Sequence, residues 1–267
     1  SVVAGRVYTQ GHVAGQEVVI ALDERTGERL WTAAVGPAER VAYPGSRSTP
    51  TVDGGFLYVE TVAGDIARLE AMTGRVVWRK NLKQDFAGRP GVWGYAESPL
   101  VDGERIVVTP GGARAALVTL DKRTGRVIWQ AVVPSDLRET WKHIRDPYAD
   151  PGVAAYSSVT VAEVGGVRQY VQFLQQGVVG IRADDGQFLW WDGSSSNDAA
   201  NCPTPVFHDG HVFSAAGWRG ASLIRLVPQG RNVTAQLVWA NNVLRNQYGG
   251  FFLHDGFVYG CSDEILT

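Results

Sequence analysis

Blocks of one charge, long apolar runs and cysteines are all scarce in this sequence. Its 267 residues include 25 Lys and Arg against 27 Asp and Glu, and no stretch is strongly basic. This composition argues against nucleic-acid binding, because phosphate contacts need clustered cations. No apolar run approaches the roughly 20 residues that a membrane-spanning helix needs. We therefore expect no transmembrane segment in this chain.

Ligand sets for a metal are also missing. The two cysteines, Cys202 and Cys261, lie far apart and outside any metal-ligand spacing. They can be two buried free thiols or one disulfide, and they do not decide the compartment. The histidines are scattered, and no carboxylate or cysteine completes a set around His208 and His211. We expect no metal site from these residues.

Glycine and tryptophan, in contrast, are abundant, with 32 and 9 residues. Many tight turns and large aromatic side chains suit a many-stranded all-β protein. Hydrophobic residues make up 45% of the chain and charged residues 19%, so a substantial core is possible and disorder is not expected.

A Thr-Gly-x-x-x-Trp motif recurs at intervals of roughly 50 residues, a length that indicates repeated structural units. It occurs in DERTGERLWT from Asp23, EAMTGRVVWR from Glu70 and DKRTGRVIWQ from Asp121, with weaker copies in RADDGQFLWW and RNVTAQLVWA. The glycine permits a turn, and the tryptophan offers a flat apolar surface to the next unit. The predicted docking residues are Gly27, Trp31, Gly74, Trp78, Gly125, Trp129, Gly186, Trp190 and Trp239.

A second motif keeps step with the first and predicts a hairpin in each unit. In STPTVDGGFLYVE and ESPLVDGERIVVT, Asp-Gly separates two apolar runs, and both residue types tolerate positive φ. Each unit is therefore predicted to have four antiparallel strands. Such a unit cannot bury both faces of its sheet alone and must stack on its neighbours.

We predict a β-propeller of four-stranded antiparallel blades, and a solenoid of stacked sheets is the competing architecture. The expected blades are residues 1–35, 48–82, 97–133, 156–192, 203–241 and a partial blade at 249–267, all within one domain. The segment from Pro134 to Ala155 is an insertion between units. Its Trp141, His143 and Tyr148 can form either a lid or a plain surface helix.

The Asp-x-x-Thr-Gly-x-x-x-Trp pattern resembles the tryptophan-docking repeat of the PQQ-like β-propellers over nearly the whole chain. This superfamily includes the quinoprotein alcohol dehydrogenases and the BamB-like lipoprotein subunit of the outer-membrane β-barrel assembly machinery. The resemblance implies eight blades and an extracytoplasmic location, in the periplasm or cell envelope. Because the chain stops within its sixth unit, we expect it to be a fragment, truncated at both ends.

The links between blades should gather near the propeller axis on one face. Each link carries a polar or aromatic residue beside small residues, which allows the side chains to converge on a common binding site. The candidate ligand-binding residues are Arg47, Tyr95, Glu97, Tyr156, Ser157, Asn201, Gln247 and Tyr248. Alternatively, these side chains hydrogen-bond the loop backbone and one another around a water-filled channel.

The resemblance leaves three functions open. The leading expectation is a non-catalytic module that binds a protein, a peptide or a small ligand and needs no cofactor. The first alternative is an alcohol or sugar dehydrogenase that uses PQQ and calcium, with Glu97 and Asn201 as calcium ligands and Asp198 or Asp263 as the base. The adjacent cysteine pair of such enzymes is absent, and no inner-strand tryptophan offers a cofactor floor. The second alternative is an extracytoplasmic sensor domain of a larger protein.

Overall fold

The computed structural model describes residues 1–39, 41, 43–135, 137, 153–197, 199–262 and 265–266. Its strands form successive antiparallel sheets, and within each sheet the strands follow chain order. The first three sheets contain β1 (Val2–Val3), β2 (Arg6–Val13), β3 (Gln16–Asp23) and β4 (Arg29–Pro37); β5 (Thr51–Asp53), β6 (Phe56–Glu60), β7 (Asp65–Glu70) and β8 (Val76–Asn81); and β9 (Leu100–Asp102), β10 (Arg105–Val108), β11 (Leu117–Asp121) and β12 (Val127–Ala131).

The next sheets repeat this arrangement. They contain β13 (Thr160–Val164), β14 (Val167–Leu174), β15 (Gly177–Arg182) and β16 (Phe188–Asp192); β17 (Val206–His208), β18 (His211–Ala215), β19 (Ala221–Gln229) and β20 (Asn232–Asn241); and the hairpin of β21 (Phe251–His254) with β22 (Phe257–Ser262), beside which β23 (Ile265–Leu266) pairs with the end of β22. The described part of the chain thus contains five four-stranded antiparallel sheets and this smaller one. The all-β fold predicted from the repeats is confirmed.

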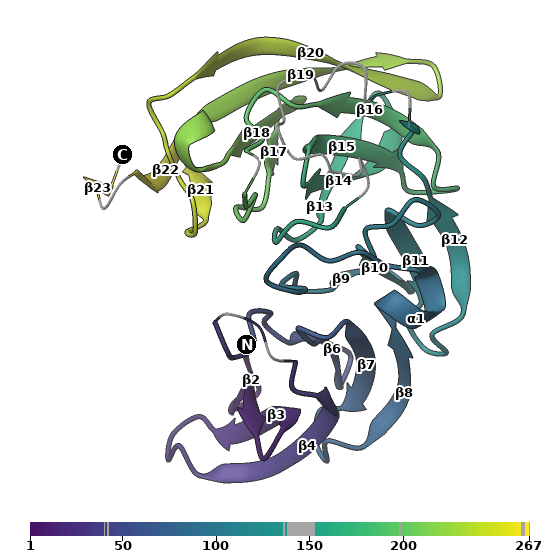
Figure 1. Ribbon diagram of the computed structural model, residues 1–267, viewed down its shortest axis with the longest axis vertical. Helices are drawn as coiled ribbons and strands as arrows, with labels where there is room; N and C mark the ends of the chain where they lie inside the picture. The colour runs from purple at the N-terminus through teal and green to yellow at the C-terminus, as the bar shows by residue number, and fades with distance from the viewer. Residues whose placement is uncertain are drawn as a thin grey trace.

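The sheets follow one another around an open arc (Figure 1). The first strand of a sheet, such as β9 or β13, lies toward the inside of the arc, and the last strand, such as β8 or β12, runs along the outside. Five hydrophobic clusters each join two neighbouring sheets, so the core lies between blades rather than in one central mass. The strands that carry the motif tryptophans therefore lie on the outside of the arc.

The Asp-Gly hairpins adopt two different registers. Asp209 and Asp255 take positive φ together with the following glycine, as the motif predicts. Asp53 and Asp102 instead pair within the ladder, opposite Phe56 and Arg105, and the turn moves one residue further along the chain. The aspartate is therefore a turn residue in only some of the blades.

Tryptophan docking follows the predicted scheme at three blade boundaries. The indole N–H groups of Trp31, Trp78 and Trp129 donate to the main-chain carbonyls of Ala71, Lys122 and Ala183 in the next blade, at 3.1–3.2 Å. Each ring also lies against the turn glycine of that blade, respectively Gly74, Gly125 and Gly186. Glycine is needed there because φ is positive and a Cβ atom would meet the indole ring.

The fourth tryptophan departs from this scheme. The Trp190 indole N–H donates to Gln169 Oε1 of its own sheet at 2.5 Å, and its ring covers Gly180 rather than reaching a glycine turn in the next blade. Its ring still packs among apolar residues of the fifth sheet, including Val212 and Ile224. Trp190 therefore docks on the fifth sheet through apolar contacts, while its indole N–H bonds within its own sheet.

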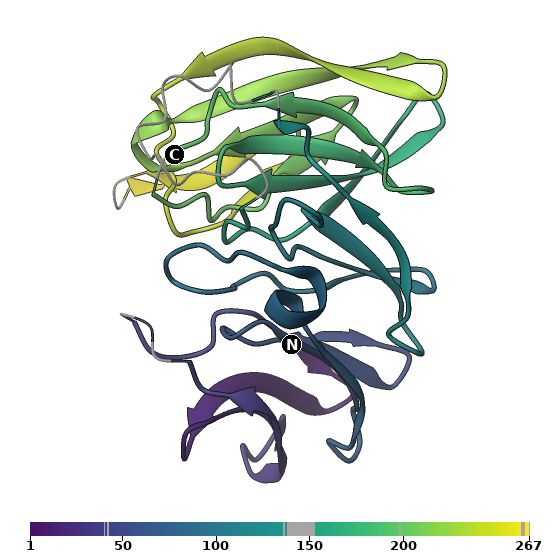
Figure 2. The same ribbon diagram turned by 45° about the vertical axis from the view of Figure 1, so that its right-hand side comes forward.

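Helices are few among the described residues. Helix α1 (Leu82–Phe86) follows β8, and the Asn81 side chain caps it by accepting the amides of Lys83 and Gln84. Figure 2 brings α1 to the front, beside the second and third sheets, and its buried Leu82 and Phe86 join the cluster between them. The short 3-10 turn η2 (Gly217–Arg219) precedes β19. No helix in the described ranges combines the length and apolarity that a bilayer crossing requires.

Candidate binding site on the propeller axis

All five links between successive blades meet at one open pocket of about 570 Å³. Every link contributes at least one lining residue, as expected for segments that return from an outer strand to the next inner strand. The pocket is lined by Tyr43, Arg47, Trp93, Ala96, Tyr156, Ala200, Cys202 and Tyr248. Three of the predicted site residues, Arg47, Tyr156 and Tyr248, are thus brought together.

Among the described residues, Arg47 is the one charged residue in this lining. Its guanidinium donates to the main-chain carbonyl of Trp93 at 2.8 Å and to that of Tyr43 at 2.5 Å. No carboxylate of the described chain lies within ion-pair distance of it. A guanidinium has five N–H donors, so Arg47 keeps donor capacity for an acidic or carbonyl group of a ligand.

Aromatic rings surround this cation. Trp93 and Tyr156 lie with ring centroids 5.6 Å apart, and the Tyr156 hydroxyl accepts the Trp93 amide at 3.3 Å. Tyr43 and Tyr248 are largely exposed, at 70% and 81% of their surface. One pair of rings is therefore held in place by the fold, whereas the other two rings stand free at the mouth of the pocket.

The pocket offers no activated nucleophile. Burial raises the pKa of the Cys202 thiol to about 11, so the thiol is neutral near pH 7. Burial also raises the pKa of the Tyr156 hydroxyl. The lining is thus suited to holding an apolar or aromatic group beside a polar group rather than to acid–base or nucleophilic chemistry.

The structure does not bring the other predicted site residues into this pocket. The Tyr95 side chain is buried over Gly64, and its hydroxyl donates to the carbonyl of Pro110 at 2.8 Å. The reversal of the chain at Gly94, where φ is +82°, explains why Tyr95 and Trp93 face opposite ways. Gln247 lies beside Gly217 instead.

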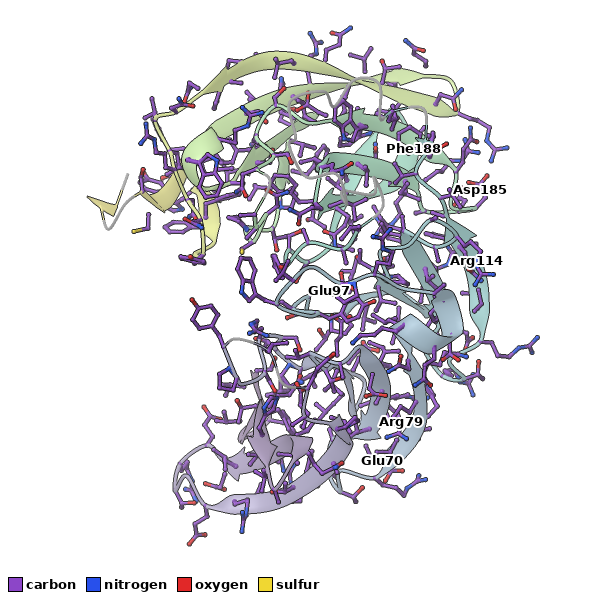
Figure 3. All side chains as sticks on the ribbon, viewed as in Figure 1. Glu70, Arg79, Glu97, Arg114, Asp185 and Phe188 are labelled. Atoms are coloured by element: carbon purple, nitrogen blue, oxygen red, sulfur yellow. The ribbon has the colours of Figure 1, made fainter. Side chains whose placement is uncertain are left out.

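Glu97 and Ser157 belong to a buried polar network under the links. The Glu97 carboxylate accepts the amide of Thr109 at 2.5 Å and the side-chain amide of Gln172 at 3.0 Å, and the Ser157 hydroxyl donates to Gln172 Oε1 at 2.9 Å. Figure 3 shows Glu97 toward the inner side of the arc, away from the outer rim where Glu70 and Asp185 lie. These two side chains bond within the protein, which was the alternative left open by the sequence.

A second buried acid faces Glu97. Neither carboxyl oxygen of Glu60 has a hydrogen-bond partner of ordinary geometry in the described chain, although the Glu97 main-chain N–H lies close enough to oppose the rise in the Glu60 pKa. Burial and the Glu97 charge raise the Glu60 pKa well above its usual range. Burial also raises the Glu97 pKa, to about 7, although hydrogen bonds from Thr109 oppose the shift. Because both pKa values are raised, the pair retains a proton near neutral pH, and that proton supplies a donor between the two acids.

The Asn201 side chain likewise forms its hydrogen bonds within the protein. Its amide donates to the carbonyls of Leu174 and Gln175, both at 2.9 Å, and its oxygen accepts the Asn197 amide at 3.0 Å. The oxygens of Glu97 and Asn201 are thus already used in separate networks, so these two residues do not fit the calcium site that the dehydrogenase alternative needs. Nor does any group of three or more His, Cys, Asp or Glu in the described part of the chain have a metal-binding arrangement.

Some predicted residues lie outside the described ones. These are the two candidate bases, Asp198 and Asp263, and the insertion residues Trp141, His143 and Tyr148. The cysteines, which are described, are both free, so the disulfide alternative is wrong; Cys202 is half-buried and Cys261 is exposed, so the expectation that both thiols are buried is wrong as well.

Sequence reasoning missed Trp93, Tyr43 and Cys202 as lining residues. A signal for Trp93 was present, because Gly91 and Gly94 on either side leave room for a large ring. The side chain of Tyr156 fills the space that a Cβ at Gly91 would enter. Which aromatic residue of a link turns outward depends on φ at a single glycine, and a residue pattern does not specify that angle.

Comparisons with known proteins agree with this architecture. The family model described as outer membrane protein assembly factor BamB matches residues 15–267. The relatives include BamB of Xanthomonas campestris, 28% identical over 41% of this chain and 26% of its own length, and BamB of Nitrosomonas eutropha, 24% identical over 66% and 36%. Quinohemoprotein alcohol dehydrogenase of Comamonas testosteroni is 29% identical over 51% of this chain and 20% of its own length.

Solved structures match the fold over a larger share of the chain. The structure of BamB from Moraxella catarrhalis superposes with a TM-score of 0.64 and 15% identity over 99% of this chain and 69% of that one. Quinohemoprotein alcohol dehydrogenase from Comamonas testosteroni superposes with a TM-score of 0.56 and 19% identity over 90% and 42%. At these identities the match concerns the fold alone.

The family match rests on the repeats already described. The chain spans about a quarter to a third of the length of the curated BamB relatives that it matches, whereas the family model covers nearly all of the chain. The docking turns and the four-stranded sheets are the structural features that correspond to these sequence repeats. This chain belongs to the BamB family of PQQ-like β-propeller repeat proteins.

Proposed function

We propose that this chain is a non-catalytic binding module of the cell envelope that holds a segment of a partner protein in the axial pocket. The observation that carries the proposal is the lining of that pocket, where four aromatic side chains from four links converge around Arg47, which has no carboxylate partner among the described residues. Tyrosine, tryptophan and arginine are the residues most enriched at the centres of protein interfaces. The names of the BamB relatives support a role in outer membrane protein assembly.

The chemistry of the pocket indicates what such a segment carries. An apolar or aromatic side chain fits between the rings, and an acidic side chain or a main-chain carbonyl can accept hydrogen bonds from Arg47. No carboxylate of the described residues lines the pocket, so an acidic group meets no like charge from them. The exposed Tyr43 and Tyr248 can close over the bound segment at little cost, because tyrosine has few rotatable bonds.

Site-specific photo-crosslinking in cells that make the full-length protein tests this proposal. A photoreactive residue at Tyr248 or Trp93 should crosslink to a protein that acts in outer membrane protein assembly, and Arg47→Ala should weaken the crosslink. The matched control is the same residue at Ile128, which is exposed on the outer strand β12. Crosslinks at Ile128 without any at the pocket positions would contradict the proposal.

The dehydrogenase alternative predicts a different result in vitro. We expect no saturable binding of PQQ in the presence of calcium, because the oxygens of Glu97 and Asn201 are already engaged by Thr109, Gln172 and Asn197. Quenching of tryptophan fluorescence during a PQQ titration measures this directly. Tight calcium-dependent binding that Glu97→Gln abolishes, together with dye-linked alcohol oxidation, would establish the enzyme instead.

A further inference from the structure

Another pocket lies at the opposite end of the strands from the links, where the second and third sheets meet. Its volume is about 510 Å³, and its lining is Phe56, Arg68, Asp121, Arg123 and Thr124. Phe56 and Arg68 belong to β6 and β7, Asp121 ends β11, and the other two residues lie in the turn before β12. Both sheets have four strands in this chain, so the pocket does not arise from an incomplete blade.

Arg68 is the cation that the fold holds in place in this pocket. The residue is buried, with 9% of its surface exposed. Its guanidinium carbon lies 3.5 Å from the centroid of the Phe56 ring, and its Nη1 atom donates to the main-chain carbonyl of Arg123 at 2.9 Å. Stacking on the ring and this hydrogen bond together fix the plane of the guanidinium.

The other edge of this guanidinium lacks a partner. Within the described part of the chain, Nε of Arg68 has no acceptor, and no carboxylate lies within ion-pair distance of the side chain. The nearby Asp121 carboxylate instead accepts the amides of Arg123 and Thr124, at 3.0 and 2.8 Å. Buried donors almost always find acceptors, so the free edge of Arg68 indicates a position for a ligand.

Two other arginines show which group this edge binds. Arg182 of the fourth sheet has the same setting, because its Nη1 atom donates to the main-chain carbonyl of Arg231 in a turn of the next sheet, at 2.9 Å. Its Nε and Nη2 atoms bind the two oxygens of Asp185, at 2.9 and 2.7 Å. Arg168 binds Asp102 through the same two atoms, at 3.2 and 2.7 Å. In both cases a carboxylate fills the edge side-on.

We propose that this pocket binds a carboxylate ligand, which Arg68 holds through its Nε and Nη2 atoms. The exposed side chain of Arg123 supplies a second positive charge, and Asp121 carries the one negative charge of the described lining. The ligand therefore carries two carboxylates, as a small dicarboxylic acid or an acidic peptide does. Because Nε is screened from solvent, its neighbours must shift slightly to admit the carboxylate. This site is separate from the axial pocket.

Nitrogen-15 NMR of the full-length protein tests this proposal. The Nε–Hε signal of Arg68 is assigned by its loss in Arg68→Lys and is then followed during a titration with glutarate. We expect a saturable shift, and a much smaller one with sulfate at equal ionic strength. An unchanged Arg68 signal, or an equal response to sulfate, would overturn the proposal.

A second probe distinguishes the two sources of the carboxylates. It is a peptide with two glutamates and blocked ends, titrated under the same conditions. Tighter binding of the peptide than of glutarate identifies an acidic polypeptide segment as the ligand, whereas tighter binding of glutarate identifies a small acid. Saturation by neither probe would overturn the proposal.

Protein variants locate the ligand, with the main-chain amide signal of Thr124 as the readout. Arg68→Lys keeps the charge but loses the planar fork, so binding should weaken by roughly tenfold. Arg123→Ala should weaken it by about threefold, as expected for an exposed ion pair. Arg126→Ala is the matched control, because it removes a charge beside the same turn but does not line the pocket.

Circular dichroism checks that the three variants fold. Binding to Arg126→Ala should be unchanged. Equal weakening in Arg123→Ala and Arg126→Ala would overturn the proposal, because net charge rather than the pocket would then attract the ligand. Undiminished binding to a folded Arg68→Lys variant would overturn it as well.

Discussion

At the scale of single residues, two glutamates control how this fold responds to pH. Glu60 ends β6 and Glu97 precedes β9. Both residues are buried, with only 1% and 4% of their surface exposed. Burial disfavours the charged form of each, and two facing carboxylates repel each other. The folded protein therefore holds a proton at this pair more tightly than the unfolded chain does.

We predict that the free energy of unfolding falls as the pH rises toward and beyond neutrality. The folded pKa of each acid is raised, so the stabilisation is complete below about pH 4.5, the ordinary glutamate value, and is lost as the pH rises through the folded pKa values, of which that of Glu97 is about 7. Urea unfolding at pH values between 5 and roughly 8.5 measures this loss.

Glu60→Gln should reduce that pH dependence, because a neutral amide replaces one of the two titrating carboxyls, and the raised pKa of Glu97 accounts for what remains. Glu70→Gln is the matched control. Glu70 is partly exposed and its pKa is lowered by Arg75, so the slope above pH 5 should not change. An unaltered slope in Glu60→Gln would show that another group carries the proton.

At the scale of structural elements, the same Thr-Gly turn serves two purposes in different blades. Gly27 and Gly74 have nearly identical φ values of +72° and +73°. A Cβ at Gly74 would lie 2.6 Å from Cε3 of Trp31, whereas nothing lies within 4 Å of one at Gly27. The glycine is needed for the turn in both places, and within this chain a tryptophan ring lies on Gly74 but not on Gly27.

Alanine substitutions at Gly27 and Gly74 distinguish the cost of backbone strain from the cost of a steric clash with the Trp31 ring. Gly27→Ala should lower the free energy of unfolding by about 1–2 kcal/mol, the cost of a left-handed alanine. Gly74→Ala should cost a further ~1–3 kcal/mol, because the Trp31 ring must move. Chemical denaturation of both variants gives the difference. Equal losses would mean that the indole ring shifts without penalty.

Bulges explain why the tryptophan stands where it does. In each four-stranded sheet the register between the third and fourth strands shifts just before the tryptophan. In the third sheet, Thr119 pairs with Trp129 and Leu120 with Val127, which leaves Ile128 as the extra residue. The three residues between glycine and tryptophan thus include one that resets the alternation of faces.

At the scale of the whole molecule, apolar interfaces between neighbouring blades stabilise the fold. Each hydrophobic cluster joins two adjacent sheets, so the middle sheets are supported on both sides and the first and last described sheets on one side. Repeat proteins with nearest-neighbour interfaces open most easily at such positions.

Hydrogen exchange of the 267-residue chain by itself, measured by mass spectrometry, should therefore vary along its length. Amides of β6, β10 and β14 should exchange more slowly, by about tenfold or more, than paired amides of β2 and β22. The comparison uses only strand amides with a ladder partner, so that simple exposure does not produce the difference. Uniform protection from β2 to β22 would indicate that all the sheets unfold as a single cooperative unit.

The sequence by itself determined the architecture of this protein. Tight turns require glycine, and Asp-Gly hairpins follow from the same backbone geometry. Because these turns recur together with a tryptophan four residues after the glycine, the pattern was sufficient to predict four-stranded blades and most of the docking contacts. The exception at Trp190 arises because Gln169, distant in the sequence, offers its indole a nearer acceptor.

Only the tertiary structure decided which link residues face the axis. Arg47, Tyr156 and Tyr248 reach the pocket, whereas Glu97 and Asn201 are drawn inward by donors and acceptors on other strands. Buried polar groups must find partners, and those partners lie far away in the chain. A residue pattern identifies the links as candidate site segments. Whether a given side chain in a link faces solvent, lines the pocket or joins a buried hydrogen-bond network is decided only when the blades pack together.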